Sequence, residues 1–373
     1  MIYLDNAATT KPFPEVVSLM QEVISEFYGN PSSTHAIGRK ARALVEQARK
    51  DVAKYIGVHS SEIIFTSGGT EAINIFLQGI APEVKHFIAS PIEHPAVINA
   101  IKDLEAKGHT VSWLNVNHKG ELDESEIGNL LAANPGSLLV AMHCNNEIGN
   151  LTDIERLSKL AESHHGYFFT DAVQTVGHYF LKLSDLPIAG LSASAHKFHG
   201  PKGVGFLYLK KGTKLHHIYA GGEQEKGLRS GTENVASIAG MAKALEICFK
   251  NLEASQHSLA ELKRRLRNSL VEAVPGIQFN GSELAGNSSN SILSASFPPH
   301  EENEMLQFNL DMAGIAVSAG SACASGAVKD SHVMAAIHHD KHRAVIRFSF
   351  SRYNTKEEVD TVIEQVKEIL RRD

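Results

Sequence analysis

The chain has 373 residues, of which 36 are Lys or Arg and 42 are Asp or Glu, so its formal net charge is −6. This mild acidity argues against a large basic surface for binding nucleic acid. Hydrophobic residues make up 43% and charged residues 21%, which excludes disorder or coiled coil as a description of the whole chain. The length predicts two or three domains, or one large domain with an appendage.

The composition also predicts a cellular location. No stretch approaches the roughly 18–20 apolar residues that a membrane span needs, and no signal peptide is visible at the N-terminus. The three cysteines, Cys144, Cys248 and Cys323, are far apart and odd in number. A disulfide framework is therefore not expected, and we predict a cytoplasmic protein with no membrane contact.

Short β-rich runs alternate with helical stretches over the first part of the chain. The predicted strands are, in order, Glu62–Thr66, His86–Ala89, Thr110–Leu114, Ser137–His143, Tyr167–Thr170, Leu191–Ser194 and Val204–Leu209. Apolar residues recur at helical spacing over Ala36–Ile56, and Gly57 stands where a helix C-cap is expected. This alternation predicts an α/β fold with a mostly parallel sheet flanked by helices.

The pattern changes in the last third of the chain. Predicted elements there are helical stretches at Glu233–Asn251, Ser255–Ala273, Glu301–Met312 and Thr355–Arg371, and strands at Asn290–Phe297, Ile315–Ser318 and Ala344–Phe350. We therefore predict a large domain over residues 1–250 and a smaller α+β C-terminal domain over residues 251–373. The boundary falls within helix, without a flexible linker, and the first 20 or so residues can pack on either domain.

Three segments of the predicted large domain carry candidate chemistry. In the first, an apolar strand runs into Ser67-Gly68-Gly69-Thr70 and then into a predicted helix. Small residues let backbone N–H groups approach an anion, and a helix N-terminus adds positive potential. The segment is therefore a candidate phosphate site, although a tight strand–helix turn explains the glycines equally well when they are taken alone.

The second and third segments supply a carboxylate and a lysine. Asp171 stands at the end of an apolar strand, where open α/β sheets bind ligands, and could pair with a protonated ring nitrogen; capping the next helix is the ordinary alternative. Lys197 lies among small residues just before a Gly/Pro-rich turn, which suits a Schiff-base lysine. Lys202, in the same turn, is interpreted as a solvated loop lysine. Together, a phosphate site, a carboxylate and a Schiff-base lysine are the groups that pyridoxal 5'-phosphate (PLP) requires.

The chain resembles the cysteine desulfurases of the NifS/IscS type, in the class V aminotransferase group of fold-type I PLP enzymes. The resemblance covers essentially the whole length and rests on the segments Tyr3–Thr10, Gly29–Ser33, Thr66–Glu71, Glu93–Val97, Asn145–Gly149, Thr170–Gln174, Ala195–Lys197, Arg229–Asn234, Gly320–Cys323 and Ile346–Ser349. Their occurrence in family order makes a chance match very improbable.

The resemblance implies a role for each matching residue. The cofactor PLP would be held covalently by Lys197, with Asp171 on the pyridine N–H and Gln174 on the ring hydroxyl oxygen. His94 would stack on the ring and shuttle protons. The phosphate would be held by Gly69, Thr70, Ser194 and His196, with Thr232 reaching it from the other subunit of a homodimer. Asn146 and Arg347 would bind the carboxylate of the substrate, L-cysteine; a guanidinium suits this role because it can grip a carboxylate with two N–H groups.

Cys323 decides the predicted function. It stands in Ser318–Gly326, a polar, Gly-rich segment unlike a hydrophobic core, whereas Cys144 and Cys248 are interpreted as inert core residues. The resemblance implies that L-cysteine becomes L-alanine while its sulfur forms a persulfide on Cys323. That sulfur would then pass to an acceptor protein, an iron–sulfur cluster scaffold or a tRNA-thiolating enzyme. The segment after Cys323, Val328–His332, departs from the family pattern, which leaves the acceptor open.

Two alternatives to this function are considered. One is a PLP enzyme of the same fold with another reaction, such as transamination or selenocysteine lysis. The other is a non-catalytic adaptor that only docks sulfur-transfer partners, against which the presence of Lys197, Asp171 and Cys323 together argues. No metal site is expected, because His338 and His342, although spaced as zinc ligands on a helix can be, have no Cys or Glu partner.

Overall fold

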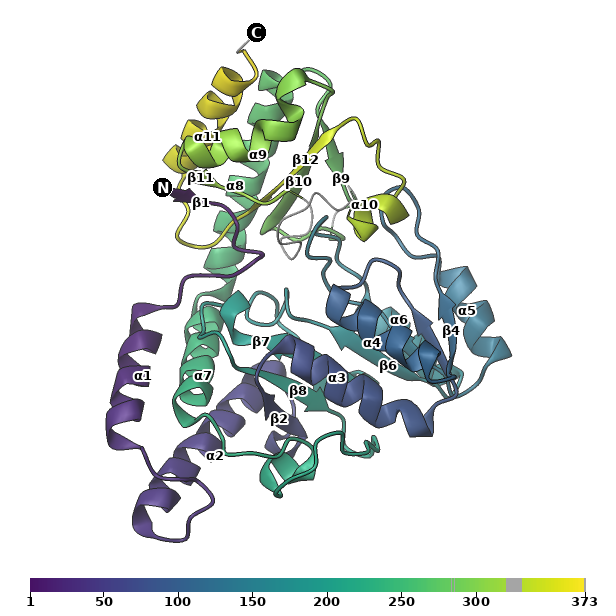
Figure 1. Cartoon of the computed structure of the whole chain (residues 1–373), viewed down its shortest axis with the longest axis vertical. Coiled ribbons are helices and arrows are strands. Elements are labelled where there is room, and N and C mark those ends of the chain that lie inside the picture. Colours follow the sequence, from purple (N-terminus) through teal and green to yellow (C-terminus); the bar gives the residue numbers. More distant parts are fainter. Residues whose placement is uncertain (283, 285, 320–330, 372–373) are drawn as a thin grey trace.

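The computed structural model describes residues 1–282, 284, 286–319 and 331–371 (Figure 1). Its strands are β1 (Ile2–Tyr3), β2 (Ile63–Thr66), β3 (His86–Ala89), β4 (Thr110–Trp113), β5 (Leu138–Val140), β6 (Tyr167–Asp171), β7 (Gly190–Ser194), β8 (Gly205–Leu209), β9 (Gln278–Asn280), β10 (Ile292–Phe297), β11 (Ile315–Ala316) and β12 (Ala344–Ser349). Its α-helices are α1 (Pro14–Glu26), α2 (Ala36–Ile56), α3 (Gly69–Ile80), α4 (Pro95–Ala106), α5 (Glu124–Ala133), α6 (Ile154–Ser163), α7 (Val235–Lys250), α8 (Leu252–Ala273), α9 (Leu306–Met312), α10 (His332–Ala336) and α11 (Lys356–Ile369).

A seven-stranded sheet with the order β2-β8-β7-β6-β5-β3-β4 forms the centre of the larger part. Only β8 runs against the others, since it pairs antiparallel with both β2 and β7. All seven strands of this sheet were predicted from the sequence, and the mostly parallel arrangement is confirmed. Short apolar strands separated by amphipathic helices produce this arrangement because a parallel sheet must be covered on both faces.

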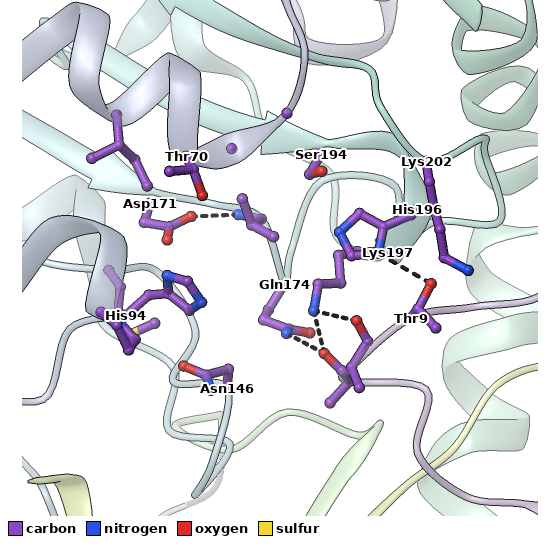
Figure 2. Close-up of a pocket in the computed structure, with 18 of the residues that line it drawn as sticks. Thr9, Thr70, His94, Asn146, Asp171, Gln174, Ser194, His196, Lys197 and Lys202 are labelled. Atoms are coloured by element: carbon purple, nitrogen blue, oxygen red, sulfur yellow. Dashed lines mark hydrogen bonds between the residues drawn. The ribbon is translucent and has the colours of Figure 1, made fainter. Parts of the chain in front are cut away.

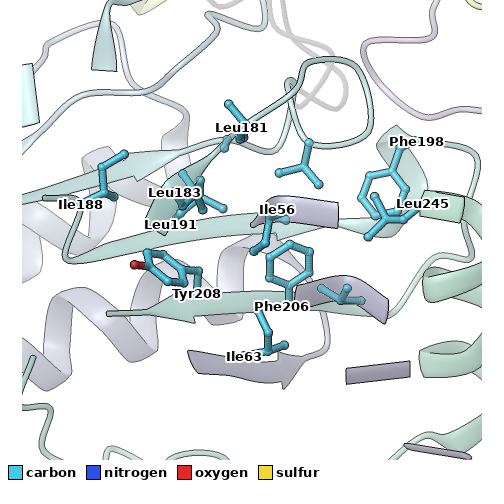
Figure 3. Packing of buried hydrophobic residues seen from close by; sticks show 14 of the residues in the cluster. Ile56, Ile63, Leu181, Leu183, Ile188, Leu191, Phe198, Phe206, Tyr208 and Leu245 are labelled. Carbon is cyan, nitrogen blue, oxygen red and sulfur yellow. The ribbon is translucent and has the colours of Figure 1, made fainter. Parts of the chain in front are cut away.

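Helices cover the two faces of this sheet (Figure 1). Alternate strand residues point to opposite faces, so Phe168 belongs to a hydrophobic cluster with residues of α2, α5, α6 and α7, while Phe169 belongs to another with residues of α3 and α4. Figure 3 shows the first of these two cores, in which Ile56 of α2 and Leu245 of α7 lie against strand residues such as Phe206. Helix α2 has the predicted bounds, and Gly57 caps it with φ of +71°.

The smaller part is built on the antiparallel sheet β12-β10-β9. One face of this sheet packs with leucines and valines of α8, α9 and α11 in a separate hydrophobic cluster. A single residue, Asn251, separates α7 from α8. The sequence did not predict β9, which has three residues and no fully buried side chain. The domain boundary after residue 250 stays a prediction.

The N-terminal residues contact both parts of the molecule. Strand β1 pairs with β11 beside the small sheet, whereas α1 packs against α7 of the large part. The residues between them, Asp5–Thr10, cross from one part to the other, and we call them the N-terminal strap. No helix in the described part of the chain is long and apolar enough to cross a membrane.

Candidate active site

A cavity of about 530 Å³ lies where the strands of the central sheet end. Residues at or after the ends of β2, β3, β5, β6 and β7 line it, together with the N-terminal strap and one side chain of β12 (Figure 2). The carboxyl ends of parallel strands are the usual ligand site of open α/β sheets. Ten of the twelve residues predicted for the site line this cavity: Gly69, Thr70, His94, Asn146, Asp171, Gln174, Ser194, His196, Lys197 and Arg347.

Asp171 is the last residue of β6 and is 4% exposed. Its Oδ1 accepts hydrogen bonds from the backbone N–H of Val173, at 2.9 Å, and from the hydroxyl of Ser192, at 3.1 Å. These two donors fix the orientation of the carboxylate. Asp171 therefore caps the next turn, as the simpler interpretation required, and also presents a charge to the cavity that can pair with a cationic ring N–H.

The candidate phosphate site lies at the start of α3. This helix begins at Gly69. Its N-cap residue is Gly68, which has no side chain that could accept a hydrogen bond from the first N–H groups of the helix. A Cβ atom on Gly69 would stand 2.7 Å from Cγ2 of Val173, so a larger residue would close the space. The positive end of α3 and the hydroxyls of Thr70 and Ser194 thus lie at one end of the cavity, where an anion is stabilised.

Lys197 ends a short 3-10 turn, Ala195–Lys197, that follows β7 directly. Its Nζ donates hydrogen bonds to the carbonyl of Ala8, at 2.8 Å, and to that of Ala7. Gln174 donates to the same Ala7 carbonyl at 2.9 Å. The strap therefore holds both side chains at the cavity (Figure 2). Lys202 is exposed, as the sequence predicted, but it also lines the mouth of the cavity beside His196.

Two histidines at the cavity are uncharged near neutral pH. Burial lowers the pKa of His94; the nearby Asp171 opposes this shift, and Lys197 and His332 add to it. Burial and the charges of Lys197 and Lys202 lower the pKa of His196 to about 4. Nδ1 of His94 accepts from the backbone N–H of Ala96 at 3.1 Å and caps α4. That acceptor role leaves Nε2 of His94 carrying the ring proton.

Arg347 also lines the cavity and is 2% exposed; its partner Asn146 lies across the cavity from Thr70 and Ser194 (Figure 2), which puts Arg347 toward that opposite end. Its Nη1 donates to the backbone carbonyl of Asn146 at 2.7 Å, and its Nη2 donates to Oδ1 of Asp5 at 2.8 Å. The Nε atom is buried and has no hydrogen-bond partner among the described residues. A guanidinium that lines a cavity with an unused donor is suited to bind a carboxylate.

Two predicted site residues are not seen in this cavity. Thr232 lines a separate depression with Tyr28 and Asn30, which agrees with a contribution to another subunit and does not test it. Cys323 lies outside the described residues. Cys144 and Cys248 are buried, and burial raises the pKa of each thiol to about 12, so both are poor nucleophiles.

Sequence reasoning missed several residues of the site. Cys144, interpreted as core, is buried but does line the cavity. Ala7, Ala8 and Asp5 contribute carbonyls and a carboxylate that no residue-type signal marked, although all three stand in the first segment that carried the resemblance. The described residues contain no group of three or more His, Cys, Asp or Glu side chains that could hold a metal ion.

The donor set fits PLP. One end of the cavity offers a helix N-terminus and hydroxyls for a phosphate, Asp171 offers a carboxylate for a pyridinium nitrogen, and Lys197 offers an amine for a carbonyl. Gly69 leaves space at the candidate phosphate site that a larger residue would fill.

Comparison with known proteins gives the family. The model of the class-V aminotransferases matches residues 2–362. The chain is 41% identical to the cysteine desulfurase IscS of Dictyoglomus turgidum, covering 99% of this chain and 94% of that protein. It is 39% identical to a cysteine desulfurase of Trichormus azollae, covering 100% and 93%.

Solved structures agree with this result. A NifS-like protein superposes with a TM-score of 0.91 at 36% identity, covering 99% of both chains. A NifS-like protein from Rickettsia africae superposes with a TM-score of 0.89 at 29% identity, again covering 99% of both. The chain therefore belongs to the class-V aminotransferase family, whose members use PLP. The resemblance to the cysteine desulfurases of the NifS/IscS type, found in the sequence, is confirmed.

Proposed function

We propose that this protein is a PLP-dependent cysteine desulfurase that converts L-cysteine to L-alanine and retains the sulfur as a persulfide on Cys323. The observation that carries the proposal is one cavity with Asp171 and Lys197 near the phosphate site and Arg347 at the other end. Such an arrangement fits an amino acid bound by its carboxylate with its amine near the cofactor. The names of the relatives support cysteine as that amino acid.

Each cofactor contact has a candidate residue. Gly69, Thr70, Ser194 and His196 would hold the phosphate, Asp171 would keep a proton on the ring nitrogen, Gln174 would bond the ring hydroxyl oxygen, and His94 would cover the ring face. When bound, PLP supplies a carbonyl that condenses with amines and a ring that takes up the electron pair of a carbon–hydrogen bond.

The remaining chemistry falls to side chains. Arg347 and Asn146 bind and orient the substrate carboxylate. With its amine free, Lys197 would take the proton from the α-carbon and return it, so that its Nζ works as general base and then acid. Neutral His94 keeps Nδ1 on the N–H of Ala96 and its ring proton on Nε2, so it can donate a proton from Nε2 and take one back there.

The sulfur step balances without an outside oxidant. The Cys323 thiolate attacks the substrate sulfur, a sulfur–sulfur bond forms, and the carbon–sulfur bond breaks. Its electron pair stays on the substrate carbon, which takes a proton and ends as the methyl group of alanine. The sulfur is thereby oxidised and the carbon reduced, and Cys323 is left as a persulfide.

We further propose a cytoplasmic homodimer that passes its sulfur to an iron–sulfur scaffold or a tRNA-thiolating acceptor. The position of Thr232 outside the cavity of its own chain supports the dimer, since the residue is then available to a second subunit. Tyr28, beside it, is 73% exposed, which suits a covered surface in an assembly. Sedimentation showing only monomer with PLP bound would contradict the dimer.

The test is to quantify alanine and sulfide from L-cysteine with the purified holoenzyme. Cys323→Ala should abolish desulfuration. The matched controls Cys144→Ala and Cys248→Ala should retain it, because both thiols are buried with pKa values of about 12. Turnover that survives Cys323→Ala would contradict the proposal and favour transamination or another reaction of this fold.

A further inference from the structure

Arg347 is the most buried charged group of the candidate site and already has a carboxylate partner within the chain. Its Nη2 donates to Oδ1 of Asp5 at 2.8 Å, while its own side chain is 2% exposed. A guanidinium so deeply buried needs a counter-charge, because an unpaired buried charge is strongly destabilising. Asp5, whose side chain is 20% exposed, supplies it.

This pair leaves part of Arg347 unsatisfied. Nη1 donates to the carbonyl of Asn146 and Nη2 to Asp5, but no residue in the described part of the chain offers an acceptor to the buried Nε. A buried N–H without a partner is costly. An acceptor that arrives in the cavity would satisfy it, and a carboxylate is the acceptor that matches a guanidinium best.

The strap that carries Asp5 is firmly fixed. Asn6 donates to the carbonyl of Ser349 at 2.9 Å, and the backbone N–H of Ala7 donates to the Ser349 hydroxyl at 2.8 Å. Ser349 stands two residues after Arg347 on β12, so the strap is attached to the strand that carries the arginine. These hydrogen bonds therefore keep Asp5 next to Arg347.

We propose that Asp5 is the internal counter-ion of Arg347. Asp5 stabilises the guanidinium while no substrate is bound, and it weakens the binding of the substrate carboxylate. Asp5 thereby sets the affinity of the site for amino acids. The inference rests on the proposed function for the identity of the substrate. It assigns to Asp5 two effects of opposite sign: Asp5 stabilises the fold and lowers carboxylate affinity. A purely structural residue would show only the first.

Asp5→Asn separates these effects, because an amide oxygen can still accept from Nη2 while the charge is gone. Binding is followed through the visible absorption of the cofactor in the holoenzyme, with L-alanine as the probe and L-alaninamide, which lacks the carboxylate, as its counterpart. The variant should bind L-alanine about three- to tenfold more tightly, as expected for removing one nearby like charge. L-alaninamide affinity should stay the same, and the melting temperature should fall by a few degrees.

The matched control is Asp360→Asn. Asp360 also pairs with an arginine, Arg265, through two hydrogen bonds of 2.7 Å, but it lies on α11 outside the cavity. This variant should bind both probes as the wild type does. If Asp5→Asn yields no folded holoenzyme, Asp5→Ser, a smaller neutral acceptor, carries the same expectation.

Unchanged or weaker binding of L-alanine by the neutral variants would overturn the proposal, as would an equal gain for L-alaninamide. The result is separable from the proposed function. A wild type that binds L-alanine but does not desulfurate L-cysteine would refute the function, while tighter L-alanine binding by Asp5→Asn would still support the counter-ion.

Discussion

The two ends of the cavity are built differently. We call the end with Gly69, Thr70 and Ser194 the phosphate end and the end with Asn146 and Arg347 the carboxylate end. The phosphate end is largely one segment, the turn from β2 into α3, and its helix N-terminus carries no side-chain cap. The carboxylate end is assembled from three distant segments, and its charge is already neutralised by Asp5. Hydrogen-bond donors that have no partner within the protein favour tight binding of a cofactor that stays in place. A carboxylate of the protein that competes with the substrate carboxylate favours release of the product at every turnover. The following predictions test this comparison and the chemistry between the two ends.

The largest effect is expected where the two ends meet, at Lys197. Lys197→Ala should remove the absorption band of the lysine-bound cofactor and lower alanine formation by more than about a thousandfold, because the variant loses both the covalent link and the proton carrier. The matched control is Lys159→Ala on the exposed face of α6, where Lys159 pairs with Glu155. Absorption spectra and alanine quantification make the comparison, and normal turnover by Lys197→Ala would refute the assigned role.

Asp171→Asn should have the next largest effect. The amide keeps the acceptor that Val173 needs but removes the charge that would hold a proton on the cofactor ring. We expect kcat to fall about a hundredfold or more, with the cofactor still bound. Asp185→Asn, at an exposed pair with Lys182, should leave kcat unchanged. A loss of less than about threefold at Asp171 would show that its charge does not serve the reaction.

Gly69→Ala tests the phosphate end directly. The added Cβ would stand 2.7 Å from Cγ2 of Val173, so the start of α3 must shift. We expect cofactor affinity, measured by equilibrium dialysis, to fall about tenfold. Gly128→Ala in α5 is the control, because its Cβ would meet nothing within 4 Å; it should stabilise the fold by up to about 1 kcal/mol. Unchanged cofactor affinity in Gly69→Ala would contradict the tight phosphate end.

The last prediction concerns pH and the N-terminal strap. His199 donates from Nδ1 to the carbonyl of Lys11 at 2.8 Å and its backbone N–H donates to Thr10, so it anchors the end of the strap. Burial lowers the pKa of His199 to about 4; its bond to the Lys11 carbonyl opposes this shift, and the charges of His178 and Arg352 add to it.

The sign of the pH effect follows from this shift. The unfolded chain protonates His199 near pH 6.5 and the folded chain only near 4, so the free energy of unfolding falls as pH drops between these values. His199→Gln should remove up to about 3 kcal/mol of that fall, measured by urea unfolding at pH 7 and pH 4.5. His118→Gln, at an exposed site, should show the wild-type dependence. If the free energy of unfolding changed equally with pH in both variants, His199 would not be the source of the predicted pH dependence.

Local patterns in the sequence predicted the phosphate end better than the carboxylate end. The strand, the glycines and the helix start are contiguous, so spacing and backbone chemistry marked Gly69 and Thr70 as candidates before the resemblance was used. Alternation likewise predicted every strand of the central sheet. Arg347 was found only through the resemblance, and Asp5 not at all, because their contact joins residues at opposite ends of the chain. Long-range pairs of this kind leave no periodic signal.

Short elements held by tertiary contacts were also missed. Strand β9 has three residues, and β11 ends at Ala316, although the sequence predicted a strand through Ser318. Ser318 instead forms an isolated bridge with Arg347. Its position is thus set by the strand that carries Arg347, a partner that local sequence does not reveal.

The most direct test of the proposed function is the mass of the peptide that contains Cys323 after the holoenzyme has reacted with one equivalent of L-cysteine in the absence of acceptor and reductant. We predict that this peptide becomes heavier by one sulfur atom, that one alanine forms for each sulfur bound, and that the peptides of Cys144 and Cys248 are unchanged. Alanine formed without added sulfur on Cys323, or sulfur found on either of the other cysteines instead, would contradict the account.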